Sequence, residues 1–518
     1  MADRREFLRA LAALGAGGAL GACAGPAPRM HFASDPFRLG VASGYPTPDG
    51  VVLWSRLAAD PLAPHGGLDP VRVPVRWTVA RDEALREIVA SGTVEATPEW
   101  AHSVHVEVRG LEPARWYWYR FAAGDAESPV GRTRTAPAAG AAAAPLRFAF
   151  ASCQQYEQGY YGAWRHVAAD APDLVAFLGD YIYESSWGRD HVRAHGAGEP
   201  YTLADYRVRY GLYKSDADLQ AGHAACPWIV TWDDHEVDND YANDRPEDGM
   251  PRAAFLARRA AAYRAYYEHM PLPARMRPDG PSMRIYTTLD WGALARFYVL
   301  DGRQYRSPQA CPRRGRSGGG NTLDVTLCRE LLDARRSMLG AAQELRLAAA
   351  LAHSQARWNV LAQQTPIAQL DQKPGPGRRA WTDGWDGYPG ARRRLLDEFA
   401  AHRVANPLAL GGDVHMFGAA DLKADFDDPA APVVASELVC TSITSQARPQ
   451  ERLLEFLPDN PHIKFVDSRH RGYVRVEVAP GLLRAELRAM ETVRERAAAC
   501  STLATFAIED GRPGPQRA

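Results

Sequence analysis

Five apolar segments between Phe148 and His415 each end on side chains that often bind metal ions. The endings are Cys153 after Phe148–Phe150, Asp180 after Leu174–Leu178, Asp233–His235 after Trp228–Val230, Gln363-Gln364 after Val360-Leu361, and Asp413–His415 after Leu408–Leu410. In open α/β sheets the loops at the carboxyl ends of strands converge, and sites are built there. A buried charge without a partner costs several kcal/mol. The pattern therefore predicts one polar site, shared by these loops, at the edge of a buried sheet.

The segment before this domain has a different periodicity. From Phe37 to about Pro137 short alternating apolar stretches recur between turn signals, which predicts a small β-sandwich over residues 37–137. Its run from Val106 to Phe121 resembles the end of a fibronectin type III domain. Residues 138–145 are nearly all Ala, Pro and Gly, as expected of a linker.

Residues 146–510 alternate apolar runs with long amphipathic stretches, which predicts an α/β domain. We expect helices at Gly162–Ala169, Leu203–Gln220, Arg252–His269, Val325–His353 and Gly390–His402.

The first thirty residues are typical of an export signal. Arg4-Arg5 is followed by Phe7-Leu8 and by a weakly apolar stretch from Ala10 to Ala22 that is too short to span a bilayer. Residues 1–30 therefore predict export in the folded state by the twin-arginine translocase, to the periplasm or cell surface. The segment ending at Cys23 also resembles a lipoprotein processing site, so lipid attachment at Cys23 and ordinary cleavage near Ala22 remain alternatives.

The charge balance of the chain limits the macromolecules that it is expected to bind. Lys and Arg total 61 and Asp and Glu total 62, so no overall field favours nucleic acid or an anionic membrane. We expect a monomer with no stable nucleic-acid binding.

Cys311 and Cys328 flank a loop rich in Gly and Arg, and they are the preferred disulfide in an oxidising compartment.

Taken together, the strand endings resemble those of the alkaline phosphatase D family, a branch of the calcineurin-like metallophosphatases related to purple acid phosphatases. Phe37–Gly44 and Asp49–Trp54 are similar to the family's N-terminal domain, and the segment from Phe150 to His415 carries its catalytic motifs. Tyr45 departs from the pattern, since an acidic residue is expected there. The resemblance implies a two-sheet α/β metallophosphatase sandwich behind the small β-sandwich. It also implies an exported, metal-dependent phosphoesterase.

The resemblance implies a first metal ion bound partly by soft ligands. Asp180 would bridge two cations, and Tyr183, three residues later, would bind the first through its phenolate. Cys153 stands where more distant relatives have their first aspartate ligand, and His415 would be the remaining ligand of the first metal ion. Thiolate, phenolate and imidazole together favour Fe³⁺ over Mg²⁺.

For the second metal ion the resemblance implies oxygen ligands and hence Ca²⁺. Asp234 stands where relatives have asparagine, and Asp413 replaces the first histidine of a Gly-His-x-His motif. Gln364 falls at the remaining ligand position, although Gln363 is an open alternative. Two residues of the acidic loop would hold a further calcium ion: Asn239 and Asp240.

The same resemblance implies the catalytic groups. His235 would lie beside the substrate and protonate the leaving oxygen. Arg303 would contact phosphate oxygens, with a structural ion pair to a nearby aspartate as the alternative. The expected reaction is attack by metal-activated hydroxide on a phosphate ester. Two alternatives stay open: a phospholipase D-like phosphodiesterase, and a noncatalytic binding protein attached to the cell surface.

Overall fold

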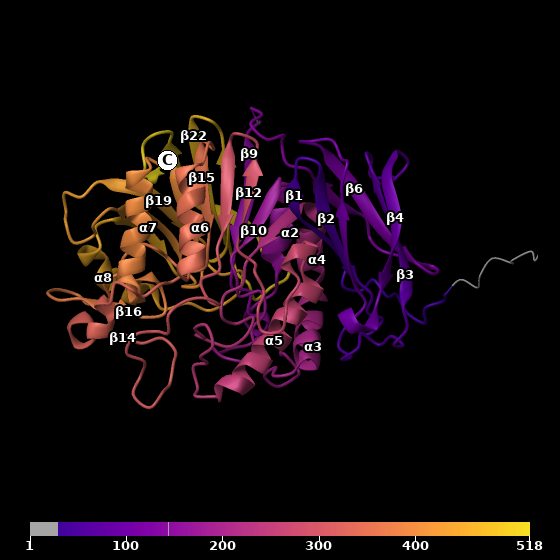
Figure 1. Cartoon of the computed structure of the whole chain (residues 1–518), viewed down its shortest axis with the longest axis horizontal. Helices are drawn as coiled ribbons and strands as arrows, with labels where there is room; N and C mark the ends of the chain where they lie inside the picture. Colours follow the sequence, from indigo (N-terminus) through magenta and orange to yellow (C-terminus); the bar gives the residue numbers. More distant parts are fainter. Residues whose placement is uncertain (1–29, 143) are drawn as a thin grey trace, which may run out of the picture.

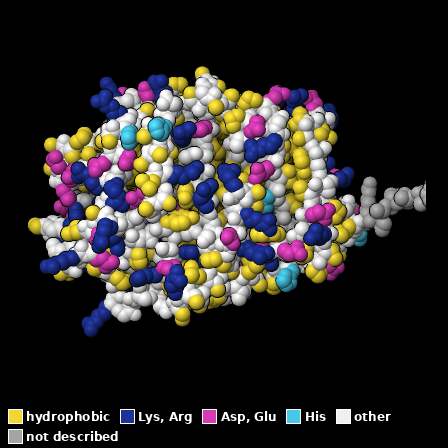
Figure 2. Space-filling model, viewed as in Figure 1, with side chains coloured by type: hydrophobic (Ala, Val, Ile, Leu, Met, Phe, Trp, Pro, Cys, Tyr) yellow, Lys and Arg dark blue, Asp and Glu magenta, His cyan; other side chains and the backbone are white. Residues whose placement is uncertain are grey.

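The computed structural model describes residues 30–142 and 144–518 (Figure 1). The predicted twin-arginine signal and Cys23 lie outside the described residues, apart from Met30. No helix within the described part of the chain has both the length and the apolar composition needed to cross a bilayer. On the face drawn in Figure 2, basic, acidic and apolar side chains are mixed, in keeping with a formal net charge of −1.

Two large sheets form the centre of the molecule. In spatial order, the ten-stranded sheet contains β24 (Gln516–Arg517), β23 (Cys500–Glu509), β22 (Leu482–Met490), β21 (Arg471–Val478), β9 (Leu146–Ala151), β10 (Leu174–Phe177), β11 (Pro227–Val230), β1 (Val41–Thr47), β2 (Gly50–Arg56) and β5 (Ser103–Val108). The seven-stranded sheet contains β12 (Thr287–Trp291), β13 (Ala295–Val299), β15 (Trp358–Ala362), β17 (Pro407–Gly411), β19 (Val433–Val439), β18 (Phe417–Lys423) and β20 (Ile463–Asp467).

The main core lies between these two sheets. Phe148 on β9 meets Phe297 on β13 edge to face, with ring centroids 5.3 Å apart. Strands β9, β10 and β11 are parallel neighbours and are buried except for Arg147 in β9, which explains their nearly continuous apolar runs. The predicted two-sheet α/β sandwich is confirmed.

Helices cover the outer faces of both sheets (Figure 1). The helices are α2 (Gly162–Asp170), α3 (Leu203–Lys214), α4 (Ala217–Ala225), α5 (Arg252–His269), α6 (Ala341–Ala352), α7 (Pro389–Ala401) and α8 (Gln450–Phe456). Short 3₁₀ turns are η1 (Pro98–Trp100), η2 (Tyr156–Gln158), η3 (Ala274–Met276), η4 (Val325–Leu327), η5 (Arg329–Leu332), η6 (Trp385–Gly387) and η7 (Leu457–Asp459). Helices α6 and α7 share a second apolar cluster with the outer face of the seven-stranded sheet.

Two predicted helices need correction. The helix expected over Leu203–Gln220 is broken into α3 and α4, because the Asp216 side chain accepts hydrogen bonds from Asp218 N and Leu219 N and caps a new helix. In the stretch expected to be helical over Val325–His353, only α6 forms, and the region before it consists of short 3₁₀ turns. The helices predicted near α2, α5 and α7 are confirmed.

The N-terminal sandwich shares a sheet with the rest of the protein. One of its layers is a separate five-stranded sheet of β4 (Ile88–Ala96), β3 (Val73–Ala80), β6 (Trp116–Ala123), β7 (Ala126–Glu127) and β8 (Gly131–Arg134). Its other layer is β1, β2 and β5, and Ser43 of β1 pairs in parallel with Pro227 of β11. The two parts are therefore joined through a continuous sheet, which local sequence patterns do not reveal because the paired strands are far apart in the chain.

Candidate active site

The loops after β9, β10, β11 and β17 meet at one edge of the two sheets, and the loops after β10, β11 and β17 line a cavity of about 970 Å³. Five of the predicted site residues in these loops have left-handed backbone conformations, which residues other than glycine rarely adopt. Their φ angles are 60° at Cys153, 59° at Asp180, 50° at Asp240, 64° at Asp413 and 57° at His415. Such conformations cost about 1–3 kcal/mol each and cluster at functional sites, where the surrounding structure enforces them. The backbone thus turns sharply at each of these residues.

A first cluster combines sulfur, nitrogen and oxygen ligands. Ligand atoms of Cys153, Asp180 and His415 lie within 4.8 Å of one another. The Tyr183 hydroxyl donates to Asp180 Oδ2 at 2.8 Å and lies 3.2 Å from His415 Nε2. His415 Nδ1 lies 2.6 Å from the Gln446 carbonyl oxygen and donates to it, so Nε2 carries the free lone pair on the cluster side. Burial lowers the pKa of His415 to about 3, assisted by the charge of Arg471, and keeps the imidazole neutral.

A second cluster contains only carboxylates and shares Asp180 with the first. It consists of Asp180, Asp233, Asp234 and Asp413. Asp180 Oδ1, Asp234 Oδ1 and Asp413 Oδ2 are buried and have no hydrogen-bond partner among the described residues. Burial, and then the charges of neighbouring carboxylates, raise the pKa of Asp180 and Asp413 well above the usual range. Buried carboxylate oxygens that lie close together and accept no hydrogen bond fit a bound cation, which would supply their missing positive partner.

A third cluster consists of Asp234, Asp240 and Asp383. Asp234 belongs to both carboxylate clusters: its Oδ2 accepts from Asp240 N at 2.7 Å, and its Oδ1 accepts no hydrogen bond but lies 3.4 Å from Arg303 Nη2. Asp383 was not predicted from the sequence. It follows the short strand β16 (Arg379–Trp381), which has no long apolar run to mark its end. Asp240 and Asp383 each offer a carboxylate to a site that adjoins the second cluster.

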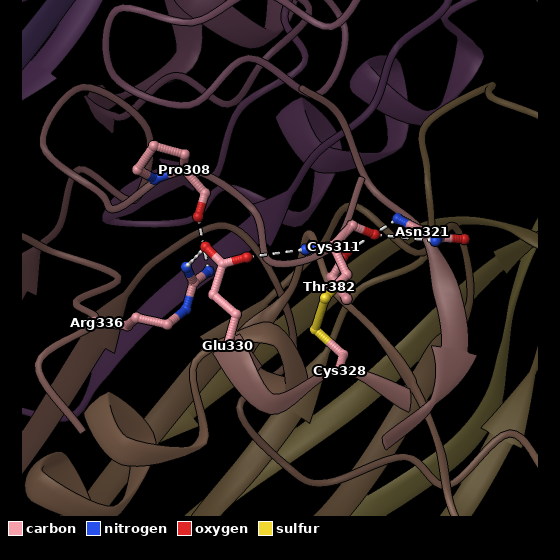
Figure 3. The surroundings of a disulfide bond; sticks show 7 residues. All are labelled: Pro308, Cys311, Asn321, Cys328, Glu330, Arg336 and Thr382. Carbon is pink, nitrogen blue, oxygen red and sulfur yellow. Dashed lines mark hydrogen bonds and ion pairs between the residues drawn. A yellow bond between two sulfur atoms is a disulfide. The ribbon is translucent and has the colours of Figure 1, made fainter. Parts of the chain in front are cut away.

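A disulfide closes the loop of residues 311–328, which we call the strap; Figure 3 shows the surroundings of this disulfide. The predicted Cys311–Cys328 disulfide is confirmed. Gly320 N donates to Asp240 Oδ2 at 2.7 Å. The strap's strand β14 (Thr322–Asp324) pairs with β16, and Asn321 N donates to Thr382 Oγ1 at 2.9 Å, next to Asp383. The strap thus contacts both segments that supply the third cluster.

His235 lines the cavity and is oriented by a carboxylate that the sequence analysis missed. His235 Nδ1 lies 2.7 Å from Oε2 of the buried Glu184, and its ring packs on Tyr183 with centroids 4.1 Å apart. Burial alone would lower the pKa of His235, but the charges of Glu184, Asp180 and Asp234 outweigh burial and raise it well above the usual range. The available signal for Glu184 was its position directly after the Asp180–Tyr183 motif.

Glu236 is a second missed residue, and it fixes the loops rather than lining the cavity. Its carboxylate accepts from Tyr181 N at 2.6 Å, Asp180 N at 3.1 Å and Asp233 N at 2.9 Å. One buried side chain therefore holds the turns after β10 and β11 in register. Its place in the run from Asp233 to Asp238 was the only sequence signal.

Three predicted site residues lie outside the metal-binding clusters. Gln364 Nε2 donates to Thr231 Oγ1 and to the Trp232 and Leu300 carbonyls, and its Oε1 accepts from Gly302 N at 3.1 Å. In this arrangement the amide is used by these bonds rather than by a metal-binding cluster, and the ligand role of Gln364 stays a prediction. Gln363 is no substitute, because its amide binds Trp385 Nε1 and backbone carbonyls.

Asn239 lines the cavity, but its amide donates to Glu247 Oε2 at 2.8 Å rather than joining Asp240 in the third cluster. Arg303 is buried and pairs with Asp233 and with Asp383, whose Oδ2 lies 2.9 Å from Nη1. These contacts agree with the ion-pair alternative for Arg303, and its phosphate contact stays a prediction.

The fold and the site together define a class of protein. A two-sheet α/β sandwich whose loops gather shared carboxylates, a thiol, a phenol and an imidazole at one edge is typical of the metallophosphatases. Residues 148–487 match the PhoD-like phosphatase family, and residues 22–137 match the PhoD-like phosphatase N-terminal domain. The chain belongs to the PhoD-like phosphatase family.

Two comparisons agree with this assignment. The chain is 46% identical to alkaline phosphatase D of Bacillus subtilis (strain 168), over 99% of this chain and 88% of that protein. A solved structure of PhoD superposes with a TM-score of 0.90 at 46% identity, over 94% of this chain and 93% of the solved chain. The protein is an alkaline phosphatase D-like phosphoric ester hydrolase, so the alternative of a noncatalytic binding protein is wrong.

Proposed function

We propose that this phosphoesterase works with one Fe³⁺ in the first cluster and Ca²⁺ in the two carboxylate clusters. Thiolate, phenolate and imidazole donors suit the iron, and carboxylate oxygens suit calcium. The observation that carries the proposal is Asp180: it belongs to the first two clusters, and its Oδ1 is buried without a partner among the described residues. A carboxylate shared in this way fits a bridge between two cations.

The cations would supply positive charge for the phosphoryl oxygens and lower the pKa of an attacking water. The protein's own groups would do the rest. His235, held by Glu184, would donate a proton to the departing alkoxide. Glu236 would keep Asp180 and Asp233 in place through its bonds to their backbone amides.

Export by the twin-arginine route is the second part of the proposal. The sequence support is Arg4-Arg5 and the apolar stretch that follows, and the strap disulfide suits an oxidising compartment. Replacing both arginines by lysine is expected to retain the precursor in the cytoplasm. Undiminished export of that variant would refute the route, and a detergent requirement that persists in Cys23→Ser would refute lipid attachment at Cys23.

Metal analysis of protein purified from its own host tests the metal assignment. We expect about one iron and one or two calcium ions per chain, and loss of both metals in Asp180→Asn with the fold retained. Asp397→Asn, an exposed change on α7, is the control and should keep the metals. A fully active preparation without iron would overturn the first-cluster assignment.

A further inference from the structure

A tryptophan that the site description has not used packs on the first cluster. The Trp187 ring is stacked on the His415 imidazole, with centroids 5.7 Å apart and planes only 8° from parallel. It also lies 6.2 Å from the Tyr183 ring, at an angle of 45°. Trp187 is half-buried and lines the cavity. One aromatic side chain therefore contacts two predicted ligands of the first metal ion.

The stack restricts the His415 ring more than its hydrogen bond does. His415 Nδ1 donates to the Gln446 carbonyl at 2.6 Å, but a single hydrogen bond to a carbonyl tolerates a range of directions. A tilt of the imidazole would drive its edge into the Trp187 indole, because the two planes are nearly parallel. The stack thus controls the direction of Nε2, the His415 atom on the cluster side.

Two glutamines fix the backbone beside Trp187, and we call them the glutamine clamp: Gln158 and Gln446. Gln158 is buried; its Nε2 donates to the Trp187 carbonyl at 2.7 Å, and its Oε1 accepts from Gln446 N at 2.6 Å. The Gln446 side chain accepts from Arg189 N at 3.2 Å and donates to the Arg189 carbonyl at 2.6 Å. Since the Gln446 carbonyl also binds His415, the clamp joins the backbone that carries Trp187 to the backbone that orients His415.

No hydrogen bond of its own fixes the Trp187 ring. Its Nε1 is buried and has no hydrogen-bond partner among the described residues, although a buried indole usually finds one. The stack and the clamped backbone therefore set the place of the ring. Gly188 follows directly, with a φ angle of 86°, and an added Cβ would lie 2.5 Å from Gln158 Nε2 and 2.8 Å from Gln446 Oε1. A side chain at Gly188 would displace both amides of the clamp.

We propose that Trp187 is a positioning residue for the phosphoesterase reaction: held by the glutamine clamp, it keeps His415 Nε2 directed at the first metal ion. It acts through His415 and does not contact the reacting atoms. Outer partners of metal-binding histidines contribute about 10–100-fold in metal affinity or activity. The inference rests on the proposed function, because it requires a metal ion in the first cluster.

Competition with EDTA measures this role on the metal-loaded enzyme. Loss of the first metal ion is followed by metal analysis and by the thiolate-to-metal absorption of Cys153, because the other clusters contain no thiol. Trp187→Ala should lower the affinity for this ion about 10–100-fold. Trp187→Phe keeps a ring for the stack and should restore most of the affinity.

Trp100→Ala is the matched control for the loss of a tryptophan. Trp100 is also half-buried, and its ring packs on Tyr267 at the same centroid distance of 5.7 Å, but neither residue lines the cavity. This variant should bind the first metal ion as the wild type does.

A pair of glycine variants tests the clamp. Gly188→Ala introduces the contacts with Gln158 and Gln446 and should lower the affinity for the first metal ion as Trp187→Ala does. Gly196→Ala is the control, because Gly196 also has a positive φ angle, 71°, but its added Cβ would meet nothing within 4 Å. Both changes strain the backbone, and only Gly188→Ala disturbs the clamp.

Steady-state kinetics separates positioning from substrate contact. With saturating metal, Trp187→Ala should lose kcat with little change in KM. A raised KM with unchanged metal affinity would make Trp187 a wall of the substrate site and overturn the inference. Wild-type metal affinity in both Trp187→Ala and Gly188→Ala would also overturn it and leave the proposed function intact. A wild-type enzyme that is active without any metal ion in the first cluster would overturn the proposed function, and the inference with it.

Discussion

Gly320→Ala tests whether the strap holds the third carboxylate cluster in place. An added Cβ would lie 2.8 Å from Asp240 Oδ2, 2.9 Å from Asp383 Cβ and 3.0 Å from Trp381 Nε1. The φ angle of Gly320 is not in the left-handed region, so alanine brings no backbone strain of its own. The steric contact is the whole perturbation, and either the strap or Asp240 must move.

Two contacts determine how much cation affinity Gly320→Ala should cost at the third cluster. Moving the strap lengthens the bond from Gly320 N to Asp240 Oδ2, now 2.7 Å, and hydrogen bonds to charged groups contribute about 1.5–3 kcal/mol. Overpacking of a buried site costs about 1–3 kcal/mol, part of which relaxation recovers. Together they should weaken cation binding at the third cluster by about 2–4 kcal/mol, or roughly 30- to 700-fold.

Calcium titration of metal-depleted protein, together with metal content after dialysis, measures this loss. Gly481→Ala is the matched control, because its Cβ would meet nothing within 4 Å and its φ angle is also outside the left-handed region. If Gly320→Ala retains as much calcium as Gly481→Ala, the strap does not support the cluster.

Three further predictions follow from other parts of the structure. Replacing Cys311 and Cys328 together by serine should lower the unfolding free energy by about 3 kcal/mol, given the separation of 17 residues, and wild type in reductant should match this variant in urea titrations. Burial lowers the pKa of Lys214 to about 7, and its ammonium lies 4.3 Å from the Trp54 ring centroid. The unfolded chain therefore binds more protons between pH 7 and 10.5, so stability should rise with pH in that window, by about 3–4 kcal/mol after the Trp54 attraction is subtracted. Lys214→Met should remove this rise, and an equal rise in the variant would assign it to other groups. His235→Ala should lower kcat about 10²–10⁴-fold for an alkyl ester but far less for a nitrophenyl ester; equal losses would reject the general-acid role.

The parts of the site that the sequence predicts are those at the ends of long buried strands. Cys153, Asp180 and His415 each stand where an apolar run stops or shortly after, and the run gives the strand its length and direction. Because parallel strands end at the same edge of a sheet, the pattern of apolar runs predicts that these three side chains lie close together. The resemblance then supplied the role of Tyr183, whose hydroxyl lies between Asp180 and His415.

The contacts that the sequence does not reveal depend on side-chain direction and on segments far apart in the chain. Gln364 follows a strand as Asp180 does, but its amide turns to backbone groups after β11 and β13. Asp383 reaches the site from the loop after β16, which pairs with the strap. The break between α3 and α4 is a single capping aspartate, Asp216, within a pattern that is otherwise amphipathic. None of these contacts leaves a periodic signal in the chain.

Charge balance links the site to the stability of the fold. The carboxylate clusters bring together six aspartates: Asp180, Asp233, Asp234, Asp240, Asp383 and Asp413. Arg303 and Arg306 are the arginines that pair with them among the described residues, which leaves a formal excess of negative charge. Removing such charges from water costs several kcal/mol per ion unless partners compensate. Bound cations would therefore contribute to folding as well as to chemistry. On this reasoning the metals stabilise the completed domain, and a translocase that carries folded proteins would allow them to be inserted inside the cell.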